Sequence, residues 1–294
     1  MDMVTKTERK KEKRGQKIAL VGSHGIGKTT QLFSLPPKST LFVDLEAGDL
    51  AVDEWEGTTV RPKTWEECTD LAVMIGGVNP ALAKIKTQYS GVHFEHCKKK
   101  YKALYEKIEG GLFEYLFVDS LTHTGRLSFQ ETSNTAEGMK DGRKAYGTHG
   151  QNMMKWLTQL QQARHMHVIF LSILNKRTDD NGFQSYNLQI EGSKTGDELP
   201  GIVDELITMT LMDEFTPNPY RAFVCRKINP WGLPAKDRAG KLEVVEKPDL
   251  GALIKKLQAP RSADLFKSLN FDLPAPAEIA ESEESTPPEK EQVS

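Results

Sequence analysis

The segment Gly22–Thr29 matches the pattern G-x-x-x-x-G-K-[ST] at every fixed position. The apolar run Ile18–Val21 comes directly before this motif, and we expect a helix over Lys28–Leu35 after it. A strand, a glycine loop and a helix in this order let backbone N–H groups curl around phosphate oxygens, and the helix amino terminus adds partial positive charge. The motif therefore predicts a nucleoside triphosphate site. Its expected contacts are Gly22, Ser23, His24, Gly25, Ile26, Gly27, Lys28, Thr29 and Thr30.

The chemistry of this loop also predicts its cofactors, ATP and Mg²⁺. Lys28 would reach the β- and γ-phosphates, and the Thr29 hydroxyl would hold the metal ion. A second metal position follows the apolar run Tyr115–Val118, which leads into Asp119. Because the carboxyl ends of parallel strands line the ligand crevice, we expect Asp119 to contact Mg²⁺ through a bound water. The alternative is that Asp119 only caps the helix that follows.

Composition argues against several other classes of protein. With 294 residues and 38% hydrophobic content, the chain has enough apolar material for one large α/β domain or two small ones. No apolar run approaches the roughly 18 residues of a membrane span, and no apolar stretch before Ile18 suits a secretory signal. Three cysteines at wide spacing argue against a disulfide framework and favour a reducing, cytoplasmic setting.

The two ends of the chain carry opposite charge. Residues 1–17 contain seven Lys/Arg against three Asp/Glu, and we expect residues 1–15 to form a flexible basic arm. Residues 271–294 contain seven Asp/Glu, one Lys and four prolines, a composition that cannot bury enough apolar surface to order itself. We therefore place one folded core at 16–258 and a disordered acidic tail at 259–294.

Within the core, short apolar runs predict strands that are buried on both faces. They are Ile18–Val21, Leu41–Val43, Leu116–Val118 and Val168–Leu171. Apolar positions at helical spacing predict a helix over Gln151–Arg164, so strands and helices alternate, which favours an α/β fold with a mostly parallel twisted sheet. Later strands are expected at Val203–Met212 and Ala222–Val224, where an antiparallel direction stays open. Residues 60–111 are expected to be a helical insertion with two helices.

The position after Asp119 bears on the catalytic base. Many ATPases carry a water-activating glutamate there, whereas this chain has Ser120. The next place to look is the end of another strand, and Asp44 and Glu46 follow the run Leu41–Val43. Proton transfer needs a carboxylate within reach of the attacking water, so we expect Glu46 to be the general base, with Asp44 as second choice. The alternative for both acids is a turn-capping role.

Polar side chains further along the chain are candidates for contact with the γ-phosphate. Ser172 and Asn175 follow Val168–Leu171 at an expected strand end, where one of them would act as a sensor. Lys236 and Arg238 are two cations two residues apart in a glycine- and proline-rich stretch, a spacing that suits a projecting finger. The alternative for this pair is an exposed basic turn.

The order of these motifs resembles that of the RecA-like recombinase ATPases. The resemblance covers residues 17–242 and rests on Gly22–Thr29, Phe42–Glu46, Phe117–Ser120 and Lys236–Arg238. It implies that Glu46 is the catalytic glutamate. It also implies that Lys236 and Arg238 act on the nucleotide of a neighbouring subunit, in a ring or filament with ATP at the subunit interfaces.

More narrowly, the chain resembles a compact phage-encoded branch implicated in single-strand annealing and recombination. The segments that carry this likeness are Asp141–Gly147 and Ala235–Arg238. In RecA-like proteins the loops after the later core strands face single-stranded DNA, and here Asn175–Phe183 and Gln189–Pro200 occupy those places. The resemblance implies phosphate contacts from Lys176, Arg177 and Lys194, and base stacking by Phe183 or Tyr186.

Other charged segments have open interpretations. Lys98–Lys102 and Lys6–Lys17 are further candidates for DNA contact, although a charge run is more often a solvated face. The acidic tail would serve as a DNA mimic, as a docking segment for a single-strand-binding or replication partner, or only as a solubility tail. His93, His96 and Cys97 have metal-ligand chemistry without the paired cysteines of a zinc site, so surface histidines are the expectation.

The sequence thus predicts an ATP hydrolase, stimulated by single-stranded DNA, that acts in phage-type recombination or annealing in the cytoplasm of a bacterial host. Two alternatives stay open. One is a P-loop small-molecule kinase, and the other is a nucleotide switch or helicase-loading protein.

Overall fold

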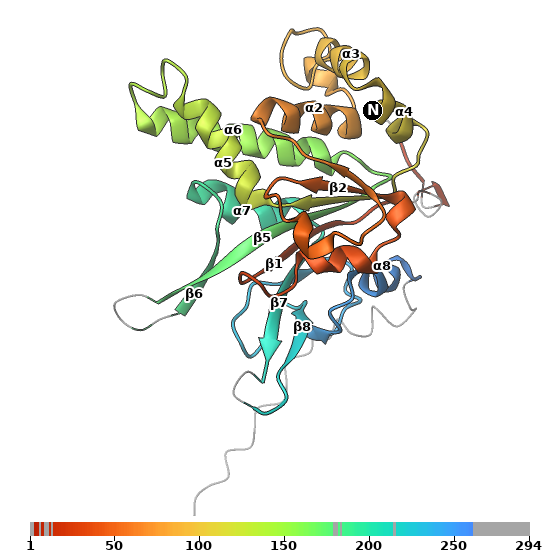
Figure 1. Ribbon diagram of the computed structural model, residues 1–294, viewed down its shortest axis with the longest axis vertical. Coiled ribbons are helices and arrows are strands. Elements are labelled where there is room, and N and C mark those ends of the chain that lie inside the picture. The colour runs from red at the N-terminus through yellow and green to blue at the C-terminus, as the bar shows by residue number, and fades with distance from the viewer. Residues whose placement is uncertain are drawn as a thin grey trace, which may run out of the picture. The chain divides into compact units, whose positions relative to one another are not determined.

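The computed structural model describes residues 3–5, 7–8, 12, 14–178, 182, 184–213 and 216–260, without the side chains of residues 193 and 194. Its core is one ten-stranded sheet (Figure 1). Six neighbouring strands are parallel. In spatial order they are β7 (Glu205–Met212), β1 (Lys17–Gly22), β5 (His167–Thr178), β4 (Tyr115–Asp119), β2 (Thr40–Asp44) and β3 (Thr58–Val60). All four apolar runs of the sequence lie in this parallel set, as predicted.

Antiparallel strands complete the sheet. β8 (Tyr220–Val224) pairs with β7, and β10 (Val245–Glu246) pairs with β8. Two further strands lie off this path: β6 (Gln184–Leu188) pairs with β5, and β9 (Lys236–Asp237) pairs with β7. Of the two later strands left open by the sequence, β7 is therefore parallel to β1 and β8 is antiparallel.

Helices cover both faces of the sheet, which explains why β1, β2 and β4 are buried at every residue. One face packs against α2 (Trp65–Gly76), α5 (Leu121–Ser133), α6 (Gly142–Gln161) and α7 (Ser193–Ile202). The other packs against the short helices η1 (Thr29–Ser34) and η3 (Asp49–Val52) and against α8 (Leu250–Gln258). Neighbouring residues of β1 illustrate the two layers, because Ala19 packs on the first side and Ile18 on the second.

Two helical segments differ from the sequence prediction. α6 begins at Gly142 instead of Gln151, because the Asp141 side chain accepts a hydrogen bond from the Arg143 N–H and caps the helix there. The region 60–111 contains three α-helices rather than two: α2, α3 (Gly91–Lys100) and α4 (Lys102–Glu109). α2 is part of the main core, since its Trp65 and Val73 are buried.

The remaining elements are the short helices η2 (Pro37–Ser39) and η4 (Pro80–Leu82). In the part of the chain that the structure describes, no helix is both long and apolar enough to cross a bilayer. The acidic tail from residue 261 onward lies outside the described residues, as does most of the basic arm.

Candidate nucleotide site

The glycine loop begins where β1 ends, at the carboxyl edge of the parallel strands. Gly22 is level with Ile173 of β5 and Met209 of β7. A side chain at Gly22 would collide with the Met209 carbonyl, since a Cβ atom there would lie 2.5 Å from that oxygen. Gly25 and Gly27 have φ angles of 68° and 103°, a region that favours glycine. The predicted strand and loop are therefore confirmed.

The helix after the loop differs from the prediction. Residues 29–34 form a six-residue 3-10 helix, η1, and the expected longer helix over Lys28–Leu35 is wrong. Leu35 has extended backbone angles, and Pro36 and Pro37 follow it, so the chain leaves the helical path after less than two α-turns. A helix this short adds little dipole, and the positive character of the loop depends on its backbone N–H groups and on Lys28.

The Lys28 ammonium lies folded against its own loop. It donates hydrogen bonds to the carbonyl oxygens of Gly22, at 3.0 Å, and Ser23, at 2.8 Å. Burial lowers the pKa of Lys28, and the nearby carboxylates of Asp119 and Glu46 oppose this effect. The ammonium therefore lies on the same side of the loop as the two acids.

Asp119 and Thr29 meet directly, as a shared metal role requires. The Thr29 hydroxyl donates to Asp119 Oδ2 over 2.5 Å. Burial raises the pKa of Asp119 to about 6, in spite of this hydrogen bond, so its negative charge is not fully compensated. Hydroxyl and carboxylate oxygens are the ligands that Mg²⁺ prefers, and this donor pair fits the ion. The capping alternative fails, because Ser120 is the residue that caps α5, accepting from the His123 N–H.

Asp44 is the last residue of β2 and Glu46 follows the strand, and of these two acids Glu46 is the one that faces this site. The Ser120 hydroxyl donates a hydrogen bond to Glu46 Oε1. Asp44 is buried and has other partners, since it accepts from the Gly48 N–H at 3.0 Å and lies 3.5 Å from Arg61 Nε. The geometry therefore favours Glu46 over Asp44 as the carboxylate available to a bound water.

The two sensor candidates do not follow a strand end, and that expectation is wrong. β5 continues through both residues to Thr178, because its polar second half pairs with β6. Ser172 is fully buried beside Val21, one residue before the level of Gly22. Asn175 lies in the β5–β6 hairpin, opposite Asn187.

Lys236 and Arg238 lie toward the amino ends of the parallel strands, whereas the glycine loop lies at their carboxyl ends. The strand β9 pairs with Glu205 and Leu206, at the start of β7, whereas the loop is level with Met209 near its end. Lys236 Nζ donates to the carbonyl oxygens of Pro200 and Val203. Both residues thus lie toward the start of β7, away from the end of the strands that carries the loop.

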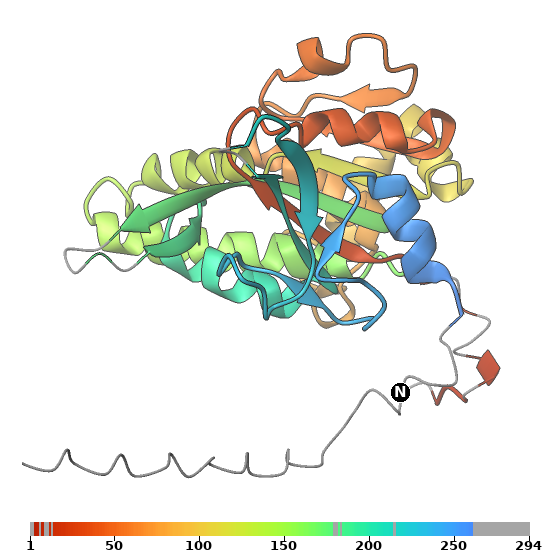
Figure 2. The same cartoon turned by 90° about the horizontal axis from the view of Figure 1, so that it is seen from below.

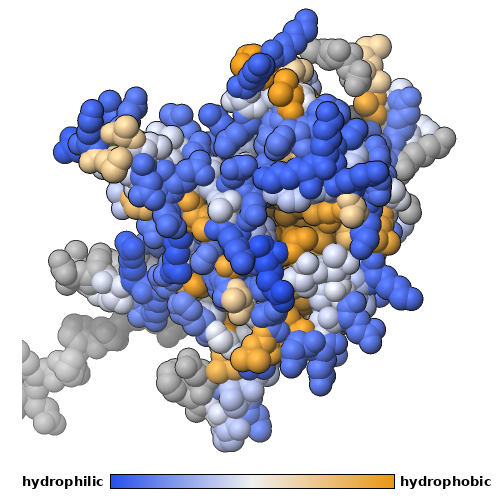
Figure 3. Space-filling model, turned by 45° about the horizontal axis from the view of Figure 1, so that its top comes forward, coloured by the Kyte–Doolittle hydropathy of each residue, from blue (hydrophilic) through white to orange (hydrophobic). Residues whose placement is uncertain are grey.

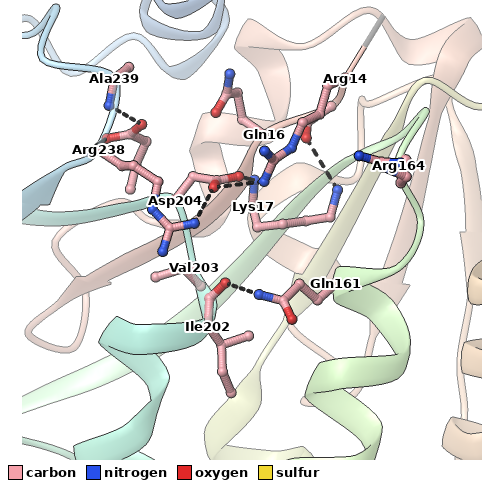
Figure 4. A network of polar contacts seen from close by, with 12 residues as sticks. Arg14, Gln16, Lys17, Gln161, Arg164, Ile202, Val203, Asp204, Arg238 and Ala239 are labelled. Atoms are coloured by element: carbon pink, nitrogen blue, oxygen red, sulfur yellow. Dashed lines mark hydrogen bonds and ion pairs between the residues drawn. The ribbon is translucent and has the colours of Figure 1, made fainter. Parts of the chain in front are cut away.

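Asp204 organises the polar contacts around Arg238 (Figure 4). Its Oδ1 atom accepts from Arg238, at 2.9 Å, and from Arg14, at 3.1 Å, while Oδ2 accepts from the Lys17 N–H at 3.1 Å. Gly15 also belongs to the core, since its N–H donates to the Arg164 carbonyl over 2.7 Å. Arg14 and Gly15, which the sequence analysis assigned to the basic arm, therefore contact the folded core. Asp204 lies between α7 and β7, and no motif in the sequence indicated that it would bind two arginines.

Four of the predicted DNA-contact residues, Lys176, Arg177, Tyr186 and Lys194, fall in strands or helices rather than in loops. Lys176 and Arg177 are exposed on β5 and Tyr186 is half-buried on β6, so they belong to one hairpin (Figures 1 and 2). The expected loop over Gln189–Pro200 is wrong from Ser193 onward, where α7 begins. Lys194 lies within that helix, and its side chain, like the whole of Phe183, is outside the described residues.

The histidine and cysteine cluster is satisfied by protein groups. His93 and Cys97 lie near Asp70, with potential ligand atoms within 4.8 Å of one another. His93 Nδ1 accepts from the Tyr89 N–H, its Nε2 contacts Asp70 Oδ1 at 2.8 Å, and Lys100 Nζ lies 3.0 Å from Asp70 Oδ2. Both ring nitrogens are thus in use and an ammonium supplies the positive charge, so these residues do not fit a zinc ion. His96 is exposed.

A mostly parallel sheet flanked by helices, with a glycine loop after β1 and a Thr–Asp pair beside it, defines a P-loop NTPase with a RecA-like core. The comparison of sequences agrees with this class. The family described as "AAA domain" matches residues 14–239, and the chain belongs to that family.

We also compared the chain with curated proteins and with solved structures. No curated protein matches the chain. Among solved structures, a KaiC-like protein from the hyperthermophilic archaeon Pyrococcus horikoshii OT3 shares 14% sequence identity, and the match covers 74% of this chain and 81% of that one. Its TM-score is 0.37, a likeness too distant to support any conclusion here.

Proposed function

We propose that this chain binds ATP with Mg²⁺ and hydrolyses it. The observation that carries the proposal is that Lys28, Thr29, Asp119 and Glu46 gather at one edge of the sheet from three separate segments. Each supplies a different requirement of triphosphate hydrolysis: a cation for the β- and γ-phosphates, metal-binding oxygens, and a carboxylate for the water.

Each of these side chains has its own role in the proposed hydrolysis. Lys28 exchanges the carbonyl oxygens of Gly22 and Ser23 for phosphate oxygens. Thr29 would hold Mg²⁺ directly and Asp119 would hold it through a water, and the ion would neutralise charge on the phosphates. Glu46 accepts a proton as a water oxygen attacks the γ-phosphorus, and the bond to the bridging oxygen breaks to leave ADP and inorganic phosphate. Ser120 holds Glu46 in position through its hydroxyl hydrogen bond.

We further propose that Lys236 and Arg238 complete the site of a neighbouring subunit. Their place at the edge opposite the loop suits a head-to-tail assembly, in which one edge of each subunit faces the other edge of the next. Exposed apolar side chains support such a contact on both sides. Leu50 is exposed on η3, which follows the carboxyl end of β2, and Ile228 and Trp231 are exposed on the segment before β9. Apolar patches of this kind interrupt a mostly polar surface in Figure 3.

The proposed target is single-stranded DNA, in phage-type recombination or annealing in the bacterial cytoplasm. Support comes from the β5–β6 hairpin, where exposed Lys176 and Arg177 stand directly opposite Tyr186 and Ser185. Cations beside an aromatic ring suit a strand whose phosphates and bases are both accessible. The hairpin extends from β5, a neighbour of β1, and so connects the proposed DNA surface with the edge that carries the nucleotide loop.

The test is ATP turnover with and without single-stranded DNA at a low and a high salt concentration. We expect DNA to raise turnover at low salt and less so at high salt. Lys28→Ala should lower turnover by about 100-fold or more, whereas Lys38→Ala, which removes an exposed lysine after η1, should not. Turnover without any effect of DNA would leave a hydrolase and remove the DNA role. Absence of turnover in the unaltered chain would contradict the enzyme itself.

A further inference from the structure

Arg221 of β8 lies beside the glycine loop. No motif in the sequence had marked this residue as a candidate. β1 ends opposite Met209, but β7 continues for three more residues with β8 paired to it, and Arg221 stands opposite Leu211. The β7–β8 ribbon thus extends past the end of β1 (Figure 1). It brings Arg221 to the edge of the sheet that carries the loop.

The contact falls on Gly27, the residue before the loop lysine. A Cβ atom placed on Gly27 would lie 3.9 Å from Arg221 Nε, 3.5 Å from Met209 Cε and 3.2 Å from Thr30 Oγ1. Arg221 and Met209 therefore form a wall over this part of the loop.

The guanidinium of Arg221 has no counter-charge within the described residues, where no hydrogen bond or ion pair engages it. Three other arginines of the core are paired instead. Arg238 and Arg14 share Asp204, and Arg61 pairs with Asp49. An exposed and unpaired guanidinium beside a loop of backbone N–H groups is arranged to receive an anion.

The position also indicates which phosphates it would meet. The carboxylates of Asp119 and Glu46 lie near the Lys28 ammonium, and this side of the loop belongs to the metal and the γ-phosphate. Arg221 instead approaches Gly27, since its Nε atom lies 3.9 Å from where a Cβ atom of that residue would be, and the backbone of Gly27 belongs to the cradle of the α- and β-phosphates. We propose that Arg221 binds the α,β-diphosphate of a nucleotide held by its own chain. This inference rests on the proposed nucleotide site and adds a ligand to it.

The main competing role is stacking of the guanidinium on the nucleotide base. The two roles differ in what they predict for pyrophosphate, which has the diphosphate but no base. A diphosphate contact makes pyrophosphate and ADP lose affinity together when Arg221 is removed. A stacking contact weakens ADP alone.

The experiment measures equilibrium binding of ATP, ADP and pyrophosphate, each with Mg²⁺, by calorimetry. The proteins are the unaltered chain, Arg221→Ala, Arg221→Lys and the matched control Lys227→Ala, which removes an exposed cation near the end of the same strand. We expect Arg221→Ala to weaken all three ligands by a similar factor of about 10- to 100-fold. Arg221→Lys should recover part of the loss, and Lys227→Ala should bind like the unaltered chain.

Other outcomes overturn the assignment. Unchanged pyrophosphate affinity in Arg221→Ala would replace the diphosphate contact by base stacking, and a loss confined to ATP would move the contact to the γ-phosphate. Equal binding by all four proteins would remove Arg221 from the site while leaving the proposed nucleotide site intact. If the unaltered chain bound neither ATP nor ADP, the proposed function would fail instead. Thermal melts of the variants, expected to match that of the unaltered chain, separate lost contacts from lost folding.

Discussion

Glu46 accepts a hydrogen bond from Ser120, and the two residues follow neighbouring strands, β2 and β4. Asp44 and Asp119 are opposite each other in the register of these strands. Ser120, which directly follows β4, therefore contacts the acid that follows the neighbouring strand β2. This contact places the Glu46 carboxylate next to the Thr29–Asp119 pair, where a carboxylate from β4 would otherwise stand.

The different contacts of Glu46 and Asp44 predict different effects when each is replaced by its amide. Glu46→Gln should keep ATP binding and lower turnover by about 100- to 10,000-fold, because the amide cannot accept the proton of the attacking water. Asp44→Asn should instead lower the free energy of unfolding, because Asp44 accepts from the Gly48 N–H and pairs with Arg61. Steady-state turnover and urea denaturation of both variants separate the two roles. Normal turnover in Glu46→Gln would rule out Glu46 as the base.

The buried carboxyl of Asp119 predicts a pH dependence of stability. Its pKa is raised by burial to about 6, from an ordinary value of 3.8. Between these values the folded chain binds more protons at this group than the unfolded chain, so the free energy of unfolding falls as pH rises from about 4 to about 6. Asp119→Asn should remove about 1–3 kcal/mol of that decline. Urea denaturation of both proteins across this pH range measures the difference.

Other groups with shifted pKa values are common to both proteins in that comparison. Glu205, whose pKa burial raises to about 8, and His167, whose pKa burial lowers to about 4, titrate in the variant as in the unaltered chain. Parallel pH profiles of the two proteins would show that Asp119 is not the responsible carboxyl. The same titration predicts that stabilisation by Mg²⁺ weakens below about pH 6, since the metal needs the ionised form.

A shared site predicts complementation between two inactive variants. Lys28→Ala lacks the loop cation and Arg238→Ala lacks the finger, so each alone should lose turnover by about 100-fold or more. A mixture of the two should regain part of the activity, because some interfaces join an intact loop to an intact finger. Arg14→Ala is the matched control, since Arg14 pairs with the same oxygen of Asp204 as Arg238 does. Equal losses in Arg14→Ala and Arg238→Ala would assign a structural role to both.

The β5–β6 hairpin predicts the salt dependence of DNA binding. If Lys176 and Arg177 each contact a phosphate, their joint replacement by alanine should reduce the slope of log affinity against log salt by about 1.4 for a single strand. Lys98→Ala with Lys99→Ala provides a control with the same loss of charge from α3. Titration of a labelled oligonucleotide at several salt concentrations measures both. A larger change of the slope in the α3 variant would indicate that DNA binds to that helix instead of the hairpin.

The interior of the sheet was largely predictable, because β1, β2 and β4 are apolar runs that only a buried position satisfies. The glycine loop was predictable for a related reason. Gly25 and Gly27 adopt positive φ angles and Gly22 tolerates no Cβ, so the local residue types and the local geometry require each other. The Thr29–Asp119 pair followed from these two elements once the strands were taken as parallel.

The structure of the polar segments could not be predicted from the sequence, because it depends on tertiary contacts. Asn175–Thr178 have no apolar pattern, and they form a strand because β6 pairs with them. Residues 29–34 form a 3-10 helix between the loop and two prolines, and η1 packs against α8 from the other end of the chain. The places of Arg221 and of the Asp204–Arg238 pair likewise depend on strands that meet only in the folded sheet.

The sequence by itself determined which residues must be buried and where the phosphate loop bends, because burial and backbone strain act on each residue locally. Only the tertiary structure decided which charges meet. Glu46 contacts Ser120, Arg238 contacts Asp204, and Arg221 lies beside Gly27 with no partner among the described residues, since the energy of a charge depends on neighbours that lie far away along the chain.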